Sequence, residues 1–162
     1  MYKNKKKIMI LGGFNSARNT ILRNMCDKTI QTVAMEYGNT QINDTQIHFF
    51  SVPPVDQFKF MYSILSKDLD GAVIIIDKCG LDKFELKLSE TFKEENLPYI
   101  IITDEKTNEL EYNIRDYENV LFSHEITEED LSEGIDILLK EIDSKKYEKN
   151  HTLCSINCET MN

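Results

Sequence analysis

A glycine turn near the start of the chain carries the residue types best suited to binding a ligand. An apolar run at residues 6–11 ends at Gly12 and Gly13, and residues 17–26 have the apolar spacing of a helix. A strand, a glycine turn and a helix in this order are the layout of a phosphate-binding loop. In such a loop, backbone N–H groups and the helix N-terminus hold the phosphate groups. The candidate nucleotide-binding residues of this loop are Gly12, Gly13, Asn15, Ser16, Ala17, Arg18, Asn19 and Thr20.

Three positions of this loop depart from the pattern G-x-x-x-x-G-K-[ST]. Counted from Gly12, the pattern requires glycine, lysine and serine or threonine where the chain has Ala17, Arg18 and Asn19. Arg18 keeps the positive charge, but its planar guanidinium is bulkier than an ammonium group. The amide of Asn19 is a weaker ligand for Mg²⁺ than the usual hydroxyl, and Thr20 lies one position too late. Two interpretations stay open: residual affinity for a nucleotide, or a turn that only joins strand to helix.

The totals of the sequence fit one globular domain. Its 162 residues are 41% hydrophobic and 29% charged, which are the values of a chain that folds around a sizeable core. The net charge of −9 argues against a general nucleic-acid binder. No apolar run has the length of a membrane span, and neither a signal peptide nor a lipidation motif is recognisable. We therefore expect a cytoplasmic protein without a stable membrane anchor.

The cysteines and histidines predict neither a disulfide framework nor a metal site. The four cysteines are scattered, at Cys26, Cys79, Cys154 and Cys158. His151 lies close to the last two, but this group lacks a fourth ligand for zinc. His124 has no nucleophile beside it in any motif, so an acid–base role is not favoured. We expect no catalytic residue and no metal ligand among these residues.

Apolar strands alternate with amphipathic helices along residues 6–142. The strands are expected at 6–11, 47–52, 71–77, 99–102 and 120–123, with a hairpin over 41–47 that turns at Asn43 and Asp44. The helices are expected at 17–26, 55–66, 81–95, 108–116 and 128–142. Continuous β-branched strands are typical of a parallel sheet that is covered on both faces. The order predicts a doubly wound α/β domain with a six-stranded, mostly parallel sheet, helices on both faces and one antiparallel strand.

The domain is expected to occupy residues 1–143. The apolar periodicity ends near Lys145, so residues 144–162 are expected to form a flexible C-terminal tail. In a doubly wound sheet, ligands bind at the carboxyl ends of the strands.

Three blocks of the sequence resemble motifs of the Ras-like small GTPases. Residues 12–20 are similar to the loop G-x-F-N-x-G-K-T-T of the archaeal and prokaryotic branch, which is MglA-like or Arf-like. Residues 32–38 resemble the first switch of that branch, T-V-A-M-D-F-G, and residues 52–61 are similar to its second switch, T-P-G-Q-E-R-F-x-F-M. The resemblance covers roughly residues 6–142 and implies a P-loop NTPase-like fold.

The resemblance implies GTP or GDP with Mg²⁺ as the ligand. It places Thr32 where the family's threonine senses the γ-phosphate through Mg²⁺, although an ordinary threonine at the entry to a strand is the other interpretation. Guanine recognition by N-K-x-D would fall on residues 104–107, which begin with Asp104. Thr107 replaces the aspartate that holds guanine, which loses a charge-assisted hydrogen bond. Ser123 begins the last recognition loop of the family.

The second switch lacks the groups that catalysis in this family requires. Pro54 replaces the glycine whose N–H meets the γ-phosphate, and proline has no N–H. Val55 replaces the glutamine that orients the attacking water. We therefore expect hydrolysis by the family mechanism to be absent or very slow.

Two functions remain in competition. The favoured one is a pseudo-GTPase-like interaction or regulatory module with impaired nucleotide binding and little or no hydrolysis. The alternative is a small GTP-binding switch protein whose divergent loop still binds GTP or GDP. For the module we expect a protein partner, such as a roadblock-type protein or another GTPase regulator. Candidates for an apolar contact patch are Phe58, Phe60 and Tyr62, of which Phe58 and Tyr62 equally suit the core.

Overall fold

The computed structural model describes residues 4–13, 17–53, 56–58, 60–77, 80–104 and 116–159, with side chains of these residues up to 145 apart from residue 56. The strands are β1 (Asn4–Gly12), β2 (Lys28–Gln31), β3 (Glu36–Ile42), β4 (Thr45–Ser51), β5 (Gly71–Ile76), β6 (Tyr99–Asp104) and β7 (Val120–Ser123). The helices are α1 (Ala17–Asn19), the π-helical turn η1 (Thr20–Asn24), the 3₁₀ turn η2 (Asp56–Phe58), α2 (Phe60–Leu65), α3 (Lys83–Glu94) and α4 (Glu128–Glu159).

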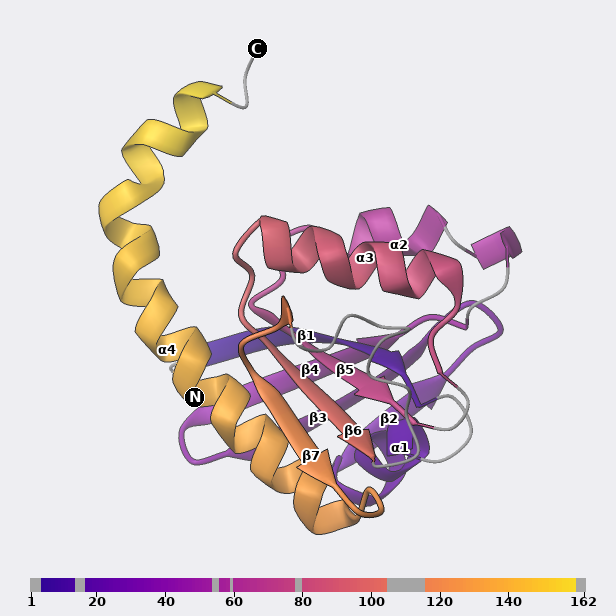
Figure 1. Ribbon diagram of the computed structural model, residues 1–162. Helices are drawn as coiled ribbons and strands as arrows, with labels where there is room; N and C mark the ends of the chain where they lie inside the picture. The colour runs from indigo at the N-terminus through magenta and orange to yellow at the C-terminus, as the bar shows by residue number, and fades with distance from the viewer. Residues whose placement is uncertain are drawn as a thin grey trace.

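All seven strands form one twisted sheet in the order β2-β3-β4-β1-β5-β6-β7 (Figure 1). The five strands from β4 to β7 in this order are parallel to one another. Strand β3 runs antiparallel to both β2 and β4, so it is the one reversed strand of the sheet. The mostly parallel α/β fold with one antiparallel strand is therefore confirmed.

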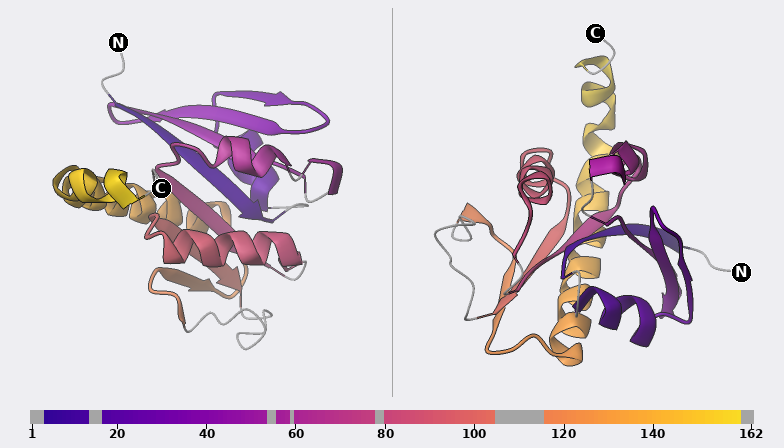
Figure 2. Two further views of the ribbon diagram at one scale, coloured as in Figure 1. Left: turned by 90° about the horizontal axis from the view of Figure 1, so that it is seen from above. Right: turned by 90° about the vertical axis from the view of Figure 1, so that its right-hand side faces the viewer.

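Helices cover both faces of the sheet, and each face has its own core (Figure 2). Alternate residues of β1 show the division, because Ile8 and Ile10 belong to one core and Met9 and Leu11 to the other. The first core is closed by α1, η1 and α4, and the second by α2 and α3. Strand β5 is buried at all of its positions. This two-sided burial explains why the apolar strands could be recognised in the sequence.

The sheet has seven strands rather than the six that were expected. The additional strand is β2, whose four residues are all exposed. It lies at the edge of the sheet and pairs only with β3 among the described strands. A short polar segment of this kind has no apolar alternation, so its pairing depends on the hairpin beside it. That hairpin was predicted, and its turn at Asn43 has the positive φ of 55° that a tight turn requires.

The helices differ from expectation mainly in their lengths. Helix α4 continues to Glu159, although an end near Ile142 was expected, and it extends past the edge of the sheet (Figures 1 and 2). The division of the chain at residue 143 stays a prediction. The helix expected at 55–66 is the short pair η2 and α2. The helix expected at 108–116 lies almost entirely outside the described residues.

Two side chains of the expected contact patch take part in the second core. Tyr62 is 1% exposed and donates its hydroxyl to the carbonyl of Val52 at 2.8 Å. Phe58 is half-buried against the same core. Of the three candidates only Phe60, at 58% exposure, is a surface residue.

The first testable feature of the fold is the close packing of α4 on β6. A Cβ added to Gly134 would lie 2.6 Å from Cδ1 of the fully buried Ile102. Overpacking of this kind costs about 1–3 kcal/mol, whereas alanine gains about 1 kcal/mol in helix propensity. We predict that Gly134→Ala lowers the free energy of unfolding, measured with urea, by up to about 2 kcal/mol.

The matched background for this test is Ile102→Val, which removes Cδ1. In that background Gly134→Ala should be neutral or stabilising, and Ser132→Ala on the exposed side of α4 should cost nothing in either background. Equal effects of Gly134→Ala in both backgrounds would contradict this account of the contact.

Candidate functional site

The predicted site residues are brought to one edge of the sheet by its parallel register. Gly12 ends β1 and pairs with Ile75, while Asp104 ends β6 and pairs with Ser123 at the end of β7. Thr32 follows β2, which runs in the same direction as β4, and so lies at the same edge. This is the carboxyl edge, where doubly wound sheets bind their ligands.

The glycine turn has a backbone that other residues adopt only with strain. Gly12 and Gly13 have φ angles of +75° and +60°, in the left-handed region. A Cβ on Gly12 would lie 2.0 Å from the carbonyl oxygen of Ile75 on β5. The N–H of Arg18 then donates to the carbonyl of Gly13 at 2.9 Å, which joins the turn to the following helix.

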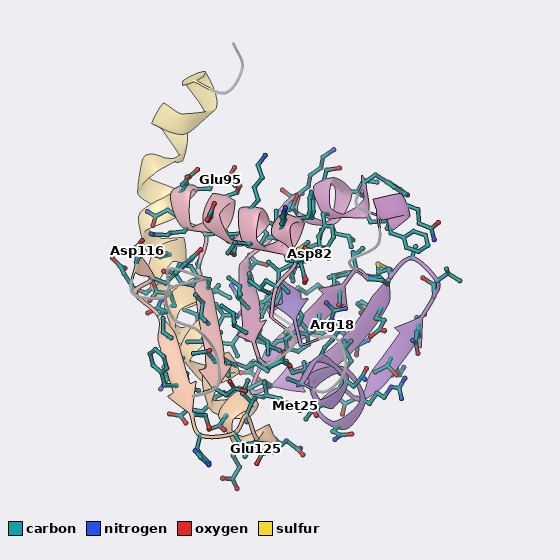
Figure 3. The ribbon with its side chains drawn as sticks, turned by 45° about the vertical axis from the view of Figure 1, so that its right-hand side comes forward. Arg18, Met25, Asp82, Glu95, Asp116 and Glu125 are labelled. Atoms are coloured by element: carbon teal, nitrogen blue, oxygen red, sulfur yellow. The ribbon has the colours of Figure 1, made fainter. Side chains whose placement is uncertain are left out.

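Arg18, at the position of the phosphate-binding lysine, points into the protein. Its side chain is 1% exposed, and a guanidinium nitrogen lies 3.8 Å from Oε2 of Glu85 on α3. Glu85 is itself only 4% exposed in its side chain. Figure 3 labels Arg18 and Asp82, the N-cap residue that precedes α3, and both lie near the carboxyl edge of the sheet. The cation of the loop is therefore neutralised inside the fold.

Glu85 also links α3 to the start of the loop through hydrogen bonds. Its Oε2 accepts the N–H of Gly12 at 2.7 Å. Its backbone N–H donates to the Asp82 carboxylate at 2.6 Å, and Asp82 N–H donates back to Oε1 at 3.4 Å. The second pair is a capping box, which satisfies N–H groups at the helix start. One carboxylate thus contacts the helix cap, the glycine turn and Arg18.

Burial governs the ionisation of this pair. Removal from water raises the pKa of Glu85, and the Gly12 N–H and the Arg18 charge oppose that rise only in part. Burial also lowers the pKa of Arg18, against the attraction of Glu85. The 3.8 Å separation is longer than a hydrogen bond, so the pairing is weaker than a close bidentate contact.

Thr32 holds a local turn together. Its hydroxyl donates to the carbonyl of Met35 and accepts the N–H of Met35, both at 3.0 Å. Its own N–H donates to the same carbonyl at 2.8 Å. The side chain expected to sense a metal-bound phosphate therefore closes the turn between β2 and β3.

Ser123 takes part in capping α4. Its hydroxyl lies 2.7 Å from a carboxylate oxygen of Asp130. The Thr127 N–H donates to the same carboxylate at 2.9 Å, and the Asp130 N–H donates to the Thr127 hydroxyl at 3.2 Å. Thr127 and Asp130 therefore form a variant of the capping box. These hydrogen bonds, that of Ser123 first, lower the pKa of Asp130.

The remaining sequence candidates divide between the described and the undescribed parts of the chain. Ala17 is buried in the first core, and Asn19 and Thr20 are half-buried at the junction of α1 and η1. Asp104 lies half-buried at the end of β6. Asn15, Ser16, Pro54, Val55 and Thr107 lie outside the described residues.

No group of metal-ligand side chains that could hold an ion occurs among the described residues. Cys26 is a free thiol whose pKa burial raises to about 11, which makes it unreactive at neutral pH. In the described part of the chain, no helix is both long and apolar enough to cross a membrane.

Glu85 is the residue of this site that the sequence patterns did not single out. The local signal was Asp82-x-x-Glu85, a capping-box sequence in the segment that follows an apolar strand after a short loop. That signal places Glu85 in the first turn of a helix at the carboxyl edge. Its contact with Gly12, 73 residues away, depends on the tertiary fold.

Sequence comparison relates this chain to an archaeal protein. No protein-family profile matches the sequence. The uncharacterized protein MJ1339 of Methanocaldococcus jannaschii is 27% identical over 106 residues, which cover 61% of this chain and 69% of that protein.

Two solved structures share the fold at low sequence identity. Translation elongation factor SelB from Methanococcus maripaludis, in complex with the GTP analogue GppNHp, has a TM-score of 0.63 at 12% identity, covering 88% of this chain and 35% of the factor. The cytosolic domain of the T. maritima FeoB iron transporter, in apo form, has a TM-score of 0.54 at 15% identity. The match covers 83% of this chain and 64% of that domain. The chain thus spans about a third of the factor and less than two thirds of the transporter domain. These likenesses show a P-loop GTPase-like fold.

Burial makes the contribution of Glu85 to stability depend on pH. Its folded pKa is raised, so Glu85 contributes stability that is full below its unfolded pKa of about 4.3 and is lost as the pH rises through the folded value. Glu85→Gln removes this titration but keeps an acceptor for Gly12. We predict that the unfolding free energy of the wild type, minus that of Glu85→Gln, falls as the pH rises from about 4.5 to 8.

The matched control is Glu90→Gln, on the exposed side of the same helix. The unfolding free energy of the wild type, minus that of Glu90→Gln, should show no such fall with pH. If the difference in unfolding free energy between the wild type and Glu85→Gln instead grows with pH, the attraction of Glu85 to Arg18 outweighs the effect of its burial. Glu85→Ala, which leaves the Gly12 N–H without its acceptor, should cost about 1–3 kcal/mol.

Proposed function

We propose that this chain is a pseudo-GTPase-like module of the MglA-like or Arf-like branch, with impaired nucleotide binding and little or no hydrolysis. The observation that carries the proposal is the burial of Arg18 against Glu85. A phosphate-binding loop needs its cation to face the ligand, and this cation faces an internal carboxylate. The fold then serves as an interaction or regulatory platform.

Other positions support the same function by different means. The Thr32 hydroxyl is engaged with Met35, and Ser123 lies in the cap of α4. In the sequence, Pro54 has no N–H for a γ-phosphate and Thr107 has no charge for guanine. These positions belong to separate segments, so one compensating change does not restore them all.

One observation favours the alternative, a switch protein that still binds GTP or GDP with Mg²⁺. Gly12 and Gly13 keep the left-handed turn of a glycine loop at the carboxyl edge. The similar elongation factor SelB was solved with a GTP analogue. The two functions differ in whether the chain binds guanine nucleotide at all.

Calorimetry and thermal unfolding with GTP, GDP and ATP, each with Mg²⁺, separate these functions. For the module we predict no heat of binding and no rise in Tm at about 1 mM nucleotide. In a chain that binds, a nucleotide at about 100 times its Kd would add about 2.7 kcal/mol to the free energy of unfolding and would raise the Tm. A nucleotide-binding small GTPase in the same buffer is the positive control. A shift with guanine nucleotide at micromolar concentration would overturn the module and support the switch.

We propose that the module binds a protein partner, such as a roadblock-type protein or another GTPase regulator, through helix α2. Phe60 and Ile64 are one helical turn apart and are 58% and 52% exposed. Exposed apolar side chains that share a helix face are typical of a contact surface. Phe122 on β7, at 53% exposure, is an apolar side chain on a different element.

Titration of a roadblock-type protein against three forms of the chain tests this partner surface. We predict that Phe60→Ser with Ile64→Ser weakens the complex at least tenfold, measured by calorimetry, because the buried apolar area is lost. Phe122→Ser should leave the affinity unchanged. Equal weakening by both changes, or binding unaffected by the α2 change, would contradict the assignment to α2.

A further inference from the structure

Glu85 and Arg18 form a buried charge pair whose geometry is poor for stability. Both side chains are withdrawn from water, at 4% and 1% exposure, but their charged atoms approach only to 3.8 Å. Pairs of this kind commonly fail to recover the free energy lost on desolvation. Burial raises the pKa of Glu85 despite the neighbouring cation, in agreement with that expectation. The pair is therefore better explained by an effect on the loop than by a gain in stability.

The position of the pair indicates what this effect is. Arg18 follows the glycine turn and is the cation nearest to it in the motif, while Glu85 reaches the turn from α3 and holds the Gly12 N–H at 2.7 Å. A buried guanidinium requires an anion, because an uncompensated charge in the interior is costly. Glu85 supplies that anion from within the chain.

Other groups around Arg18 do not supply the same contact. The Tyr62 hydroxyl acts on Arg18 but donates its proton to the Val52 carbonyl. Glu36 on β3 attracts Arg18 less strongly than Glu85 does, since its effect on the pKa of Arg18 is the smallest of the three. Glu85 is thus the principal counter-ion of Arg18 among the described residues.

We propose that Glu85 determines the specificity of the loop by acting as a built-in anion that keeps phosphate groups from binding to Arg18. This inference rests on the proposed function, because it explains how the module excludes a nucleotide. It assigns the exclusion of phosphate groups to the Glu85 carboxylate on α3, and not only to the loop residues that differ from the motif. When the charge of Glu85 is removed, Arg18 loses the strongest attraction among the described residues, and an oxyanion from outside can take the place of that charge.

Inorganic pyrophosphate is the probe, because it tests the phosphate contacts without the base. We expect Glu85→Gln to bind pyrophosphate at least tenfold more tightly than the wild type, measured by calorimetry. The control Glu90→Gln changes the net charge equally on the same helix and should match the wild type. Glu85→Gln combined with Arg18→Met should lose the gain, which would show that the new affinity depends on the guanidinium.

The outcomes separate this inference from the proposed function. Unchanged pyrophosphate affinity in folded Glu85→Gln would overturn the role of Glu85, as would an equal gain in Glu90→Gln. If Glu85→Gln does not fold, by circular dichroism, Glu85→Ala is measured under the same criteria. Failure of both to fold would also overturn the inference, since Glu85 would then be required for folding itself and not for the specificity of the loop. Tight binding of guanine nucleotide by the wild type would instead refute the module itself.

Discussion

The contact of one carboxylate with three backbone and side-chain groups holds the carboxyl edge of this sheet together. Glu85 joins the cap of α3, the N–H of Gly12 and the charge of Arg18. These groups come from segments that are far apart in the sequence, and the parallel register of β1 and β5 brings them to the same place. Because the contact is buried, its electrostatic effects are screened little by solvent. The carboxyl edge of the sheet is thereby organised around an internal charge.

Most of the fold could be predicted because its central strands are buried on both faces. Continuous apolar runs such as β5 have few alternative structures, and their alternation with helices fixes a parallel arrangement. Strand β2 was missed for the opposite reason. Residues of β2 are all exposed, so their secondary structure leaves no apolar pattern in the sequence. Edge pairing and helix continuation depend on neighbours that a local pattern does not specify.

The candidate site could be located from sequence, but its internal bonding could not. The motif predicted a strand that ends near Gly12 and a helix that contains Arg18, and the strand order placed Asp104 and Ser123 at the same edge. The roles of Thr32 and Ser123 in a turn and a helix cap follow from hydrogen bonds to Met35 and Asp130. Glu85 lies 73 residues from Gly12, a separation at which only the folded chain defines partners.

The glycine at position 12 illustrates how a residue of a binding motif can also be required by the packing of the sheet. Its missing side chain gives β5 the room to pass, since a Cβ there would lie 2.0 Å from the carbonyl oxygen of Ile75. Selection for stable folding alone would therefore keep this letter in place, whether or not a ligand is bound. A sequence search that treats such a glycine as a sign of activity therefore detects a residue that the packing of the sheet requires in any case. In this fold, the positions that give information about ligand binding are those whose residue type is not already required by the packing of the sheet.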